Sequence, residues 1–202
     1  MEPINLMNII WLLVGGLISL VFLFTLIIIL FYKKPTQGQT LIRTGFGGTA
    51  VAFSKGIYLI PVLHKLEILD TTIKRIELKL TGKNGLICKD GELIDVIATF
   101  HLRANYNEES IKNIVQTLGC EKASNIEDLQ EIFSPIFLES LNNVAKKFNF
   151  EVLRNSIPEF RDSVVANIGR DLYGFSLEDC SINYMEKLSV TQEINNYTKS
   201  FN

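Results

Sequence analysis

The chain has 202 residues, and its 20 basic and 22 acidic side chains nearly cancel to a net charge of −2. A chain so balanced, with no basic run longer than Lys33-Lys34, is a poor match for a nucleic acid partner. Beyond the apolar N-terminal segment, about 170 residues remain, enough for one domain of ordinary size or two small lobes.

The first predicted element is an apolar segment that runs from Ile9 to Tyr32 without a charged side chain. A helix of this length would reach about 36 Å, enough to cross a hydrocarbon core of about 30 Å. The residues before it carry no Lys or Arg, unlike the basic start of a cleavable signal peptide. We therefore expect a retained transmembrane helix over residues 9–32, preceded by a short tail over residues 1–8.

Basic residues flank the predicted span on one side. Lys33, Lys34 and Arg43 follow it, whereas only Glu2 carries a charge on its other side. Because cationic flanks tend to stay in the cytoplasm, we expect the N-terminus outside and the C-terminal domain in the cytoplasm. The predicted location is the cell (inner or plasma) membrane.

A polar linker over residues 33–39, in which Pro35 and Gly38 oppose helix continuation, leads into the folded domain. Three short runs then predict strands separated by glycine turns: TLIRT, TAVAF and IYLIPVL. Residues 75–80 alternate strictly, which predicts a half-buried strand whose apolar face consists of Ile76, Leu78 and Leu80.

The run from Leu86 to Ala104 predicts a hairpin. Asp90-Gly91 suits the positive φ values of a two-residue turn. Apolar side chains alternate after it, and His101 falls on the opposite face, where we expect solvent. The predicted buried set is Ile94, Val96, Ala98, Phe100 and Leu102.

The second half of the chain changes to helical periodicity. Ser124 with Glu127 fits a capping box that opens one long amphipathic helix, kinked or divided at Pro135. A shorter helix is predicted over residues 108–118. The expected core positions of the long helix are Ile126, Leu129, Phe133, Phe137, Leu141, Val144 and Phe148.

A further helix should begin at residues 156–159 and end at Gly174, burying Phe160, Val164, Ile168 and Leu172. A strand over residues 177–185 should close the fold. Strands first, then helices and one returning strand, predict an α+β fold and not a doubly wound parallel sheet.

The residues that could carry chemistry have simpler explanations. Cys88, Cys120 and Cys180 are an odd set without CxxC spacing, which predicts partly buried, reduced thiols. His64 and His101 lie in strand-like segments without neighbours at metal-ligand spacing. We expect no metal, no cofactor and no catalytic residues. The one enzymatic alternative is a membrane-tethered thiol hydrolase that uses Cys88 or Cys180 with a histidine.

Residues 45–50 read GFGGTA and satisfy the GxGxxA pattern of nucleotide-binding turns. That pattern requires a following helix, whereas only residues 51–55 separate it from Gly56 and the next predicted strand. A tight turn between strands is the better interpretation.

Three stretches, in this order, resemble the SPFH (stomatin, prohibitin, flotillin) or band 7 family: TLIRTGFGGTAVAFSKGIYLIPVLHKLEILD, LICKDGELIDVIATFHLR and GFSLEDCSINYMEK. The closest resemblance is to its membrane-anchored, bacterial flotillin-like branch. It covers residues 40–186 and implies an SPFH domain built as an antiparallel β-rich lobe followed by helices and a returning strand. It also implies a non-enzymatic protein that packs beside copies of itself and partitions membrane lipids and proteins.

Flotillin-like proteins usually continue into a long Ala/Glu-rich coiled coil, whereas residues 187–202 form a polar C-terminal tail without sustained heptads. We therefore expect either a short family member or one that relies on a longer SPFH partner.

Two segments suggest association surfaces. Gly15 and Ser19 form a small-xxx-small face that would let transmembrane helices approach closely. The apolar segment around residues 57–63 is either a core strand or a membrane contact in the cytoplasmic leaflet. The residues proposed for that contact are Phe53, Tyr58, Leu59 and Leu63.

The leading functional hypothesis is a single-pass membrane scaffold that needs no cofactor. Its partners would be membrane lipids, SPFH proteins in homo- or hetero-oligomers, and a membrane protease or transporter. Besides the thiol hydrolase, an accessory subunit of one such protease or transporter is a further alternative.

Overall fold

The computed structural model describes residues 6–169 and 172–188. The chain divides into two compact units, which we call the N-terminal unit, ending at Ile68, and the C-terminal unit, beginning at Leu69. Most of the predicted C-terminal tail, residues 189–202, and residues 1–5 of the N-terminal tail lie outside the described residues.

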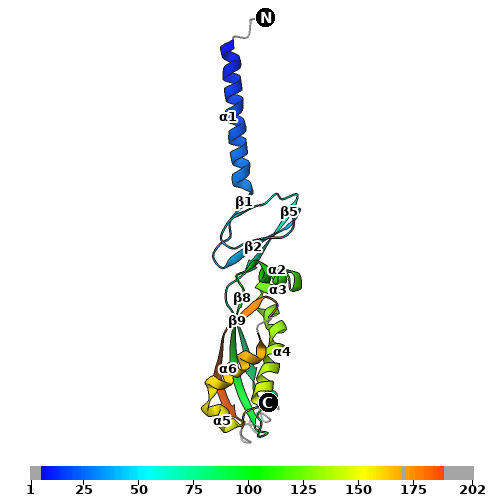
Figure 1. Cartoon of the computed structure of the whole chain (residues 1–202), viewed down its shortest axis with the longest axis vertical. Helices are drawn as coiled ribbons and strands as arrows, with labels where there is room; N and C mark the ends of the chain where they lie inside the picture. Colours follow the sequence, from blue (N-terminus) through cyan, green and yellow to red (C-terminus); the bar gives the residue numbers. More distant parts are fainter. Residues whose placement is uncertain (1–5, 170–171, 189–202) are drawn as a thin grey trace, which may run out of the picture. The chain divides into compact units, whose positions relative to one another are not determined.

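The N-terminal unit consists of one long helix and two small sheets (Figure 1). The strands form a two-stranded sheet, β1–β4, and a three-stranded sheet in the order β3–β2–β5, whose last strand runs across the unit boundary. The elements are α1 (Leu6–Phe31), β1 (Tyr32–Lys33), β2 (Gln39–Gly45), β3 (Ala50–Ala52), β4 (Ile57–Tyr58) and β5 (His64–Asp70).

The predicted strand over residues 57–63 is mostly wrong. Only Ile57–Tyr58 pairs as β4, and the amide of Leu63 instead donates to the carbonyl of Ile60 in a turn. Pro61 has no amide hydrogen to donate to a sheet, so this segment turns and the strand β5 starts after it. The GFGG segment is a turn between β2 and β3, and no helix follows it.

The C-terminal unit is built around the long strand β8. Because β8 pairs with β7 and β9 at Ile94, and with β6 and β9 at Val96, β6 and β7 share one edge of β8 and β9 occupies the other. All these pairings are antiparallel. The elements are β6 (Lys74–Leu80), a 3-10 turn η1 (Gly82–Asn84), β7 (Leu86–Ile87), β8 (Leu93–Ala104) and β9 (Phe175–Lys187).

The predicted buried face of β8 is confirmed: its five apolar side chains have no exposed area. The opposite face is less open than predicted. His101 is half-buried, and Thr99 is buried and accepts a hydrogen bond from Asn183 Nδ2 at 2.7 Å. The neighbouring strand β9 sets polar residues beside this face of β8, since Asp179 lies opposite His101 and Ser181 opposite Thr99.

The predicted hairpin forms, but its turn is longer than two residues. The amide of Cys88 donates to the carbonyl of Glu92 at 2.9 Å, which leaves residues 89–91 as the loop, with Gly91 at φ 82°. The Asp90 carboxylate accepts a hydrogen bond from the amide of Phe150 at 3.0 Å. Asp90 therefore fastens the loop to the start of a helix 60 residues away in sequence.

The helices pack against this sheet, with the long helix next to β6 and β7 and the last helix next to β9 (Figure 1). Phe137 of the long helix stacks on Phe100 of β8 with ring centroids 4.2 Å apart, and Phe133 meets Phe175 of β9 edge to face at 5.6 Å. The fold is the predicted α+β arrangement. The helices are α2 (Glu108–Thr117), α3 (Cys120–Ser124), α4 (Ile126–Ala145), α5 (Phe150–Asn155) and α6 (Ile157–Ile168).

Two predicted helix boundaries are wrong. The helix α4 continues through Pro135 but ends at Ala145, before the predicted core residue Phe148, and the short helix α5 was not predicted. The helix α6 ends at Ile168, not at Gly174, because Gly169 at φ 79° leaves the helical conformation.

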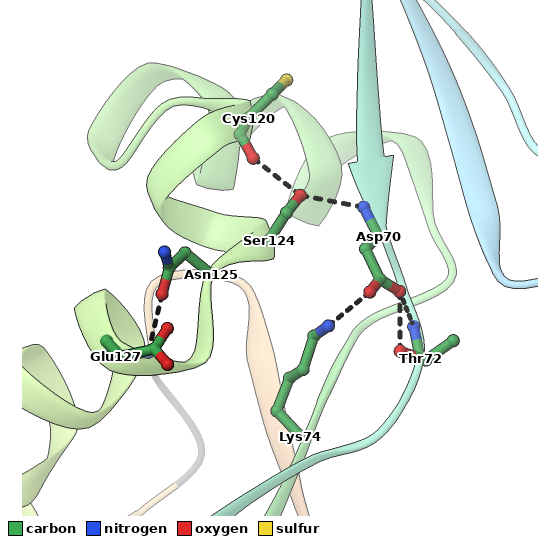
Figure 2. Close-up of polar contacts among 7 residues, drawn as sticks. All are labelled: Asp70, Thr72, Lys74, Cys120, Ser124, Asn125 and Glu127. Carbon is green, nitrogen blue, oxygen red and sulfur yellow. Dashed lines mark hydrogen bonds and ion pairs between the residues drawn. The ribbon is translucent and has the colours of Figure 1, made fainter.

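The predicted capping box at Ser124 is also wrong, and Figure 2 shows why. Asn125 caps α4, since its Oδ1 accepts a hydrogen bond from the amide of Glu127 at 2.7 Å. The Ser124 hydroxyl instead donates to the Cys120 carbonyl at 2.7 Å and accepts from the amide of Asp70 at 3.0 Å. Ser124 therefore holds the start of the C-terminal unit against the joint between α3 and α4.

Candidate membrane-contact site

Every residue of the helix α1 from Ile9 to Leu30 is exposed. Residues Ile9–Phe31 have a mean hydropathy of 2.9, and none of the most apolar stretch is buried. A water-soluble helix that is apolar on every side would be buried in a core. This helix is long and apolar enough to cross a membrane.

The end of α1 is bonded directly to the strands of the N-terminal unit. The amide of Leu59 donates to the carbonyl of Phe31 at 2.8 Å, and Tyr32 of β1 lies opposite Tyr58 of β4 with ring centroids 5.3 Å apart. The Tyr32 hydroxyl accepts a hydrogen bond from the amide of Gly56 at 3.2 Å. These contacts place residues 56–59 at the end of the apolar helix.

Two loops of this unit, residues 45–48 and 59–63, are joined to each other, and we call them the apolar loops. The amide of Phe46 donates to the carbonyl of Leu63 at 3.1 Å. A Cβ on Gly45 would lie 2.2 Å from that same carbonyl oxygen, so only glycine permits this close approach.

His64 supports the same two loops. Its Nδ1 accepts a hydrogen bond from the amide of Ile60 at 3.2 Å, and its Nε2 lies 3.0 Å from the carbonyl of Phe46. An imidazole whose Nδ1 accepts carries its proton on Nε2, so Nε2 donates to that carbonyl. His64 is thus engaged in structure, as the sequence suggested.

The apolar loops expose large hydrophobic side chains. The exposed fractions are 78% for Phe46, 92% for Val62, 49% for Leu63 and 46% for Ile60. Tyr58, beside them in β4, is 54% exposed. An apolar set of this size on one small unit is typical of a surface that meets a lipid or a protein.

The structure places the predicted contact residues unevenly. Tyr58 and Leu63 are exposed, whereas Leu59 and Phe53 are half-buried. Ile60 and Val62 belong to the apolar segment 57–63 but were not among the predicted contact residues, and Phe46 lies outside that segment. The signal for Phe46 was its position between Gly45 and Gly47. An aromatic residue in a glycine turn lies on the surface and cannot pack in a core.

Gly15 and Ser19 both lie on the exposed surface of α1. A Cβ added at Gly15 or Gly16 would meet no atom within 4 Å. Four-residue spacing places Gly15 and Ser19 on one face of the helix, so this face leaves room for the backbone of a second helix.

The cysteines are poorly placed for nucleophilic chemistry. Burial, with Asp90 and Glu92 nearby, raises the pKa of Cys88 to about 11, and burial with Asp179 nearby raises that of Cys180 to about 12. At neutral pH only about one Cys88 thiol in ten thousand is the reactive thiolate. These environments give the thiol hydrolase hypothesis no support.

The family of the chain follows from comparison with known proteins. The SPFH domain / Band 7 family matches residues 34–198, so the chain belongs to this family and the predicted resemblance is confirmed.

Among curated proteins, the flotillin family inner membrane protein YqiK of Escherichia coli (strain K12) is 26% identical over 174 residues, which cover 85% of this chain. The chain spans 31% of the length of that relative. The 174 matched residues of this chain therefore include most of its SPFH match, and the relative is named as an inner membrane protein.

Proposed function

We propose that this chain is a single-pass membrane scaffold of the flotillin type. In this proposal, α1 spans the inner or plasma membrane with the N-terminus outside, and the SPFH domain lies in the cytoplasm. The observation that carries the proposal is the exposed apolar helix that continues into a family domain through the β1–β4 pair. The protein then works by geometry and local concentration, without a cofactor.

The apolar loops are proposed to enter the cytoplasmic leaflet beside the helix. The amide of Leu59 donates a hydrogen bond to the carbonyl of Phe31, the last residue of α1. In this proposal, Tyr58 and Leu63 therefore lie at the depth of the lipid headgroups. Tyrosine suits this depth because its ring is apolar while its hydroxyl is polar. Phe46 and Val62 extend the same surface, and the half-buried Phe53 and Leu59 support it.

Lateral assembly is proposed to use the face of α1 that carries Gly15 and Ser19, together with contacts between SPFH domains. The partners are copies of this chain or other SPFH proteins, and a membrane protease or transporter would be enclosed or regulated by them. Helices in lipid pack closely through small side chains, which let their backbones approach. Apolar side chains gain no free energy by moving from lipid tails into a helix interface, so hydrophobic burial does not drive this packing.

Cross-linking of the full chain in native membranes, followed by native mass spectrometry in mild detergent, tests the scaffold. We expect oligomers in the wild type. Gly15→Leu should weaken them severalfold, whereas Gly16→Leu, one residue away on a different face, should not.

A strict monomer at membrane-like density would overturn the scaffold proposal. Equal oligomers in both glycine variants would leave the scaffold in place but remove the proposed helix face. Recovery of one protease or transporter in a fixed ratio, without larger assembly, would favour an accessory subunit.

A further inference from the structure

Acidic residues are missing from almost the whole N-terminal unit. Residues 3–66 contain no Asp or Glu, whereas the same stretch carries Lys33, Lys34, Arg43, Lys55 and Lys65. Lys65 pairs with Glu67, the first acidic residue after this stretch. The other four cations, which we call the cationic cluster, have no carboxylate within ion-pair distance among the described residues.

The contacts of the N-terminal unit attach these four residues to one short strip at the end of α1. Lys33 belongs to β1 and lies opposite Ile57, and Lys34 follows it. The Arg43 Nη1 donates to the carbonyl of Tyr58 at 3.3 Å. Lys55 precedes Gly56, whose amide donates to the Tyr32 hydroxyl.

The cationic cluster is accessible to an anion from outside the chain. Lys33, Lys34 and Lys55 are exposed, and Arg43 bonds only a neutral carbonyl, while its Nε is buried without a partner in the described part of the chain. In the described part of the C-terminal unit, by contrast, seven of the thirteen cations form ion pairs within that unit. Those in ion pairs there are Lys74, Arg75, Lys79, Arg103, Lys112, Arg161 and Lys187.

We propose that the cationic cluster binds the phosphates of anionic phospholipid headgroups and enriches these lipids around the protein. The lipid is the favoured source of phosphate because α1 ends one residue before β1, and because exposed apolar side chains accompany the cluster. Each Lys or Arg close to an anionic surface strengthens the attraction to that surface. A zwitterionic headgroup carries no net charge, so the cluster binds anionic headgroups in preference to zwitterionic ones.

This inference rests on the proposed membrane position of α1. The test uses the full chain in nanodiscs of phosphatidylcholine with a minor fraction of phosphatidylglycerol. Spin-labelled versions of the two lipids report which one is held at the protein surface. We expect the wild type to prefer phosphatidylglycerol by roughly threefold or more, and to lose most of this preference in high salt.

The variant changes Lys33, Lys34, Arg43 and Lys55 to Gln, and its preference should approach one. Its control carries the same number and kinds of change on exposed residues of the C-terminal unit, and it should keep the wild-type preference. The control residues are Lys122, Lys146, Lys147 and Arg154. A second variant retains Arg43, which bonds Tyr58, and changes only the three lysines; it should lose most of the preference while folding normally.

Three results would overturn the proposal: a wild type without preference, cluster variants that keep it, or a control that loses as much as the variant. Competition by millimolar inorganic phosphate would assign the cluster to the free ion and not to the lipid. A chain that enters nanodiscs yet shows no preference refutes this inference alone, whereas a chain that fails to enter them refutes the proposed function.

Discussion

In the N-terminal unit, Phe46 and Val62 are 78% and 92% exposed, whereas Phe100, Phe133 and Phe137 of the C-terminal unit have no exposed area. The two units also differ in how their charged side chains are paired. The cationic cluster lacks carboxylate partners among the described residues, while charges of the C-terminal unit pair with each other, as Arg103 does with Glu178 at 3.0 Å.

This difference indicates that the two units are suited to different environments. The C-terminal unit buries an apolar core against β8 and pairs seven of its described cations with its own carboxylates. The N-terminal unit leaves apolar and cationic groups exposed side by side, which is the combination that a lipid leaflet satisfies. We therefore propose that the N-terminal unit meets the membrane while the C-terminal unit lies in water.

The largest test of this comparison makes the same change in both units. Phe137→Ala removes a ring stacked on Phe100 at 4.2 Å and should lower the free energy of unfolding by about 3 to 5 kcal/mol. Phe46→Ala removes an exposed ring and should change it by no more than about 0.5 kcal/mol. Thermal and denaturant unfolding in detergent measure both. Similar losses in the two variants would mean that Phe46 is packed and that the comparison fails.

A smaller effect is expected where the C-terminal unit begins. Ser124→Ala removes the acceptor of the Asp70 amide and should cost about 1 to 2 kcal/mol of stability. The matched control, Ser134→Ala, changes a half-exposed serine within α4 and should be neutral or slightly stabilising, because alanine is the better helix former. Equal effects of the two substitutions would show that the bond shown in Figure 2 contributes nothing.

The smallest effect concerns pH. The hydrogen bond from the Phe150 amide, together with the amide of Glu92, keeps the pKa of Asp90 below its usual value of 3.8. A carboxyl group with a lowered folded-state pKa stabilises the fold above the unfolded pKa, and that contribution disappears as the pH falls through the folded value.

Asp90→Asn should therefore be less stable than the wild type at pH 7, and the gap should close below about pH 4. Unfolding midpoints measured across this range check it, with the exposed Glu139→Gln as control. A gap that stays constant down to pH 2 would mean that the charge of Asp90 is irrelevant.

The regular parts of the C-terminal unit could be predicted because their periodicity follows from burial on one face. Strict alternation gives β8 its five buried side chains, and helical spacing places Phe133 and Phe137 in the core. Two of the three family-like stretches, residues 86–103 and 174–187, lie in this unit, whereas the first, residues 40–70, lies mostly in the N-terminal unit.

The contacts that join distant segments could not be predicted. Ser124 and Asn125 are both good caps, and which one caps α4 depends on Asp70, 54 residues from Ser124 in sequence. Likewise, hydrophobicity alone assigns Val62 to a core, and only the turn at Pro61 exposes it. The candidate site was therefore found in part: the exposed Tyr58 and Leu63 were predicted as contact residues, whereas the more exposed Phe46 and Val62 were not.

The most direct measurement of the central claim is the depth of Val62 in a bilayer. A spin label on Val62→Cys of the full chain in nanodiscs is compared with one on Lys147→Cys, an exposed position of the C-terminal unit. The three native cysteines are buried, which directs labelling to the introduced thiol. We predict that the label at position 62 is accessible to oxygen and shielded from a water-soluble nickel chelate, with the reverse at position 147. A label at position 62 as open to the chelate as the one at 147 would contradict the account.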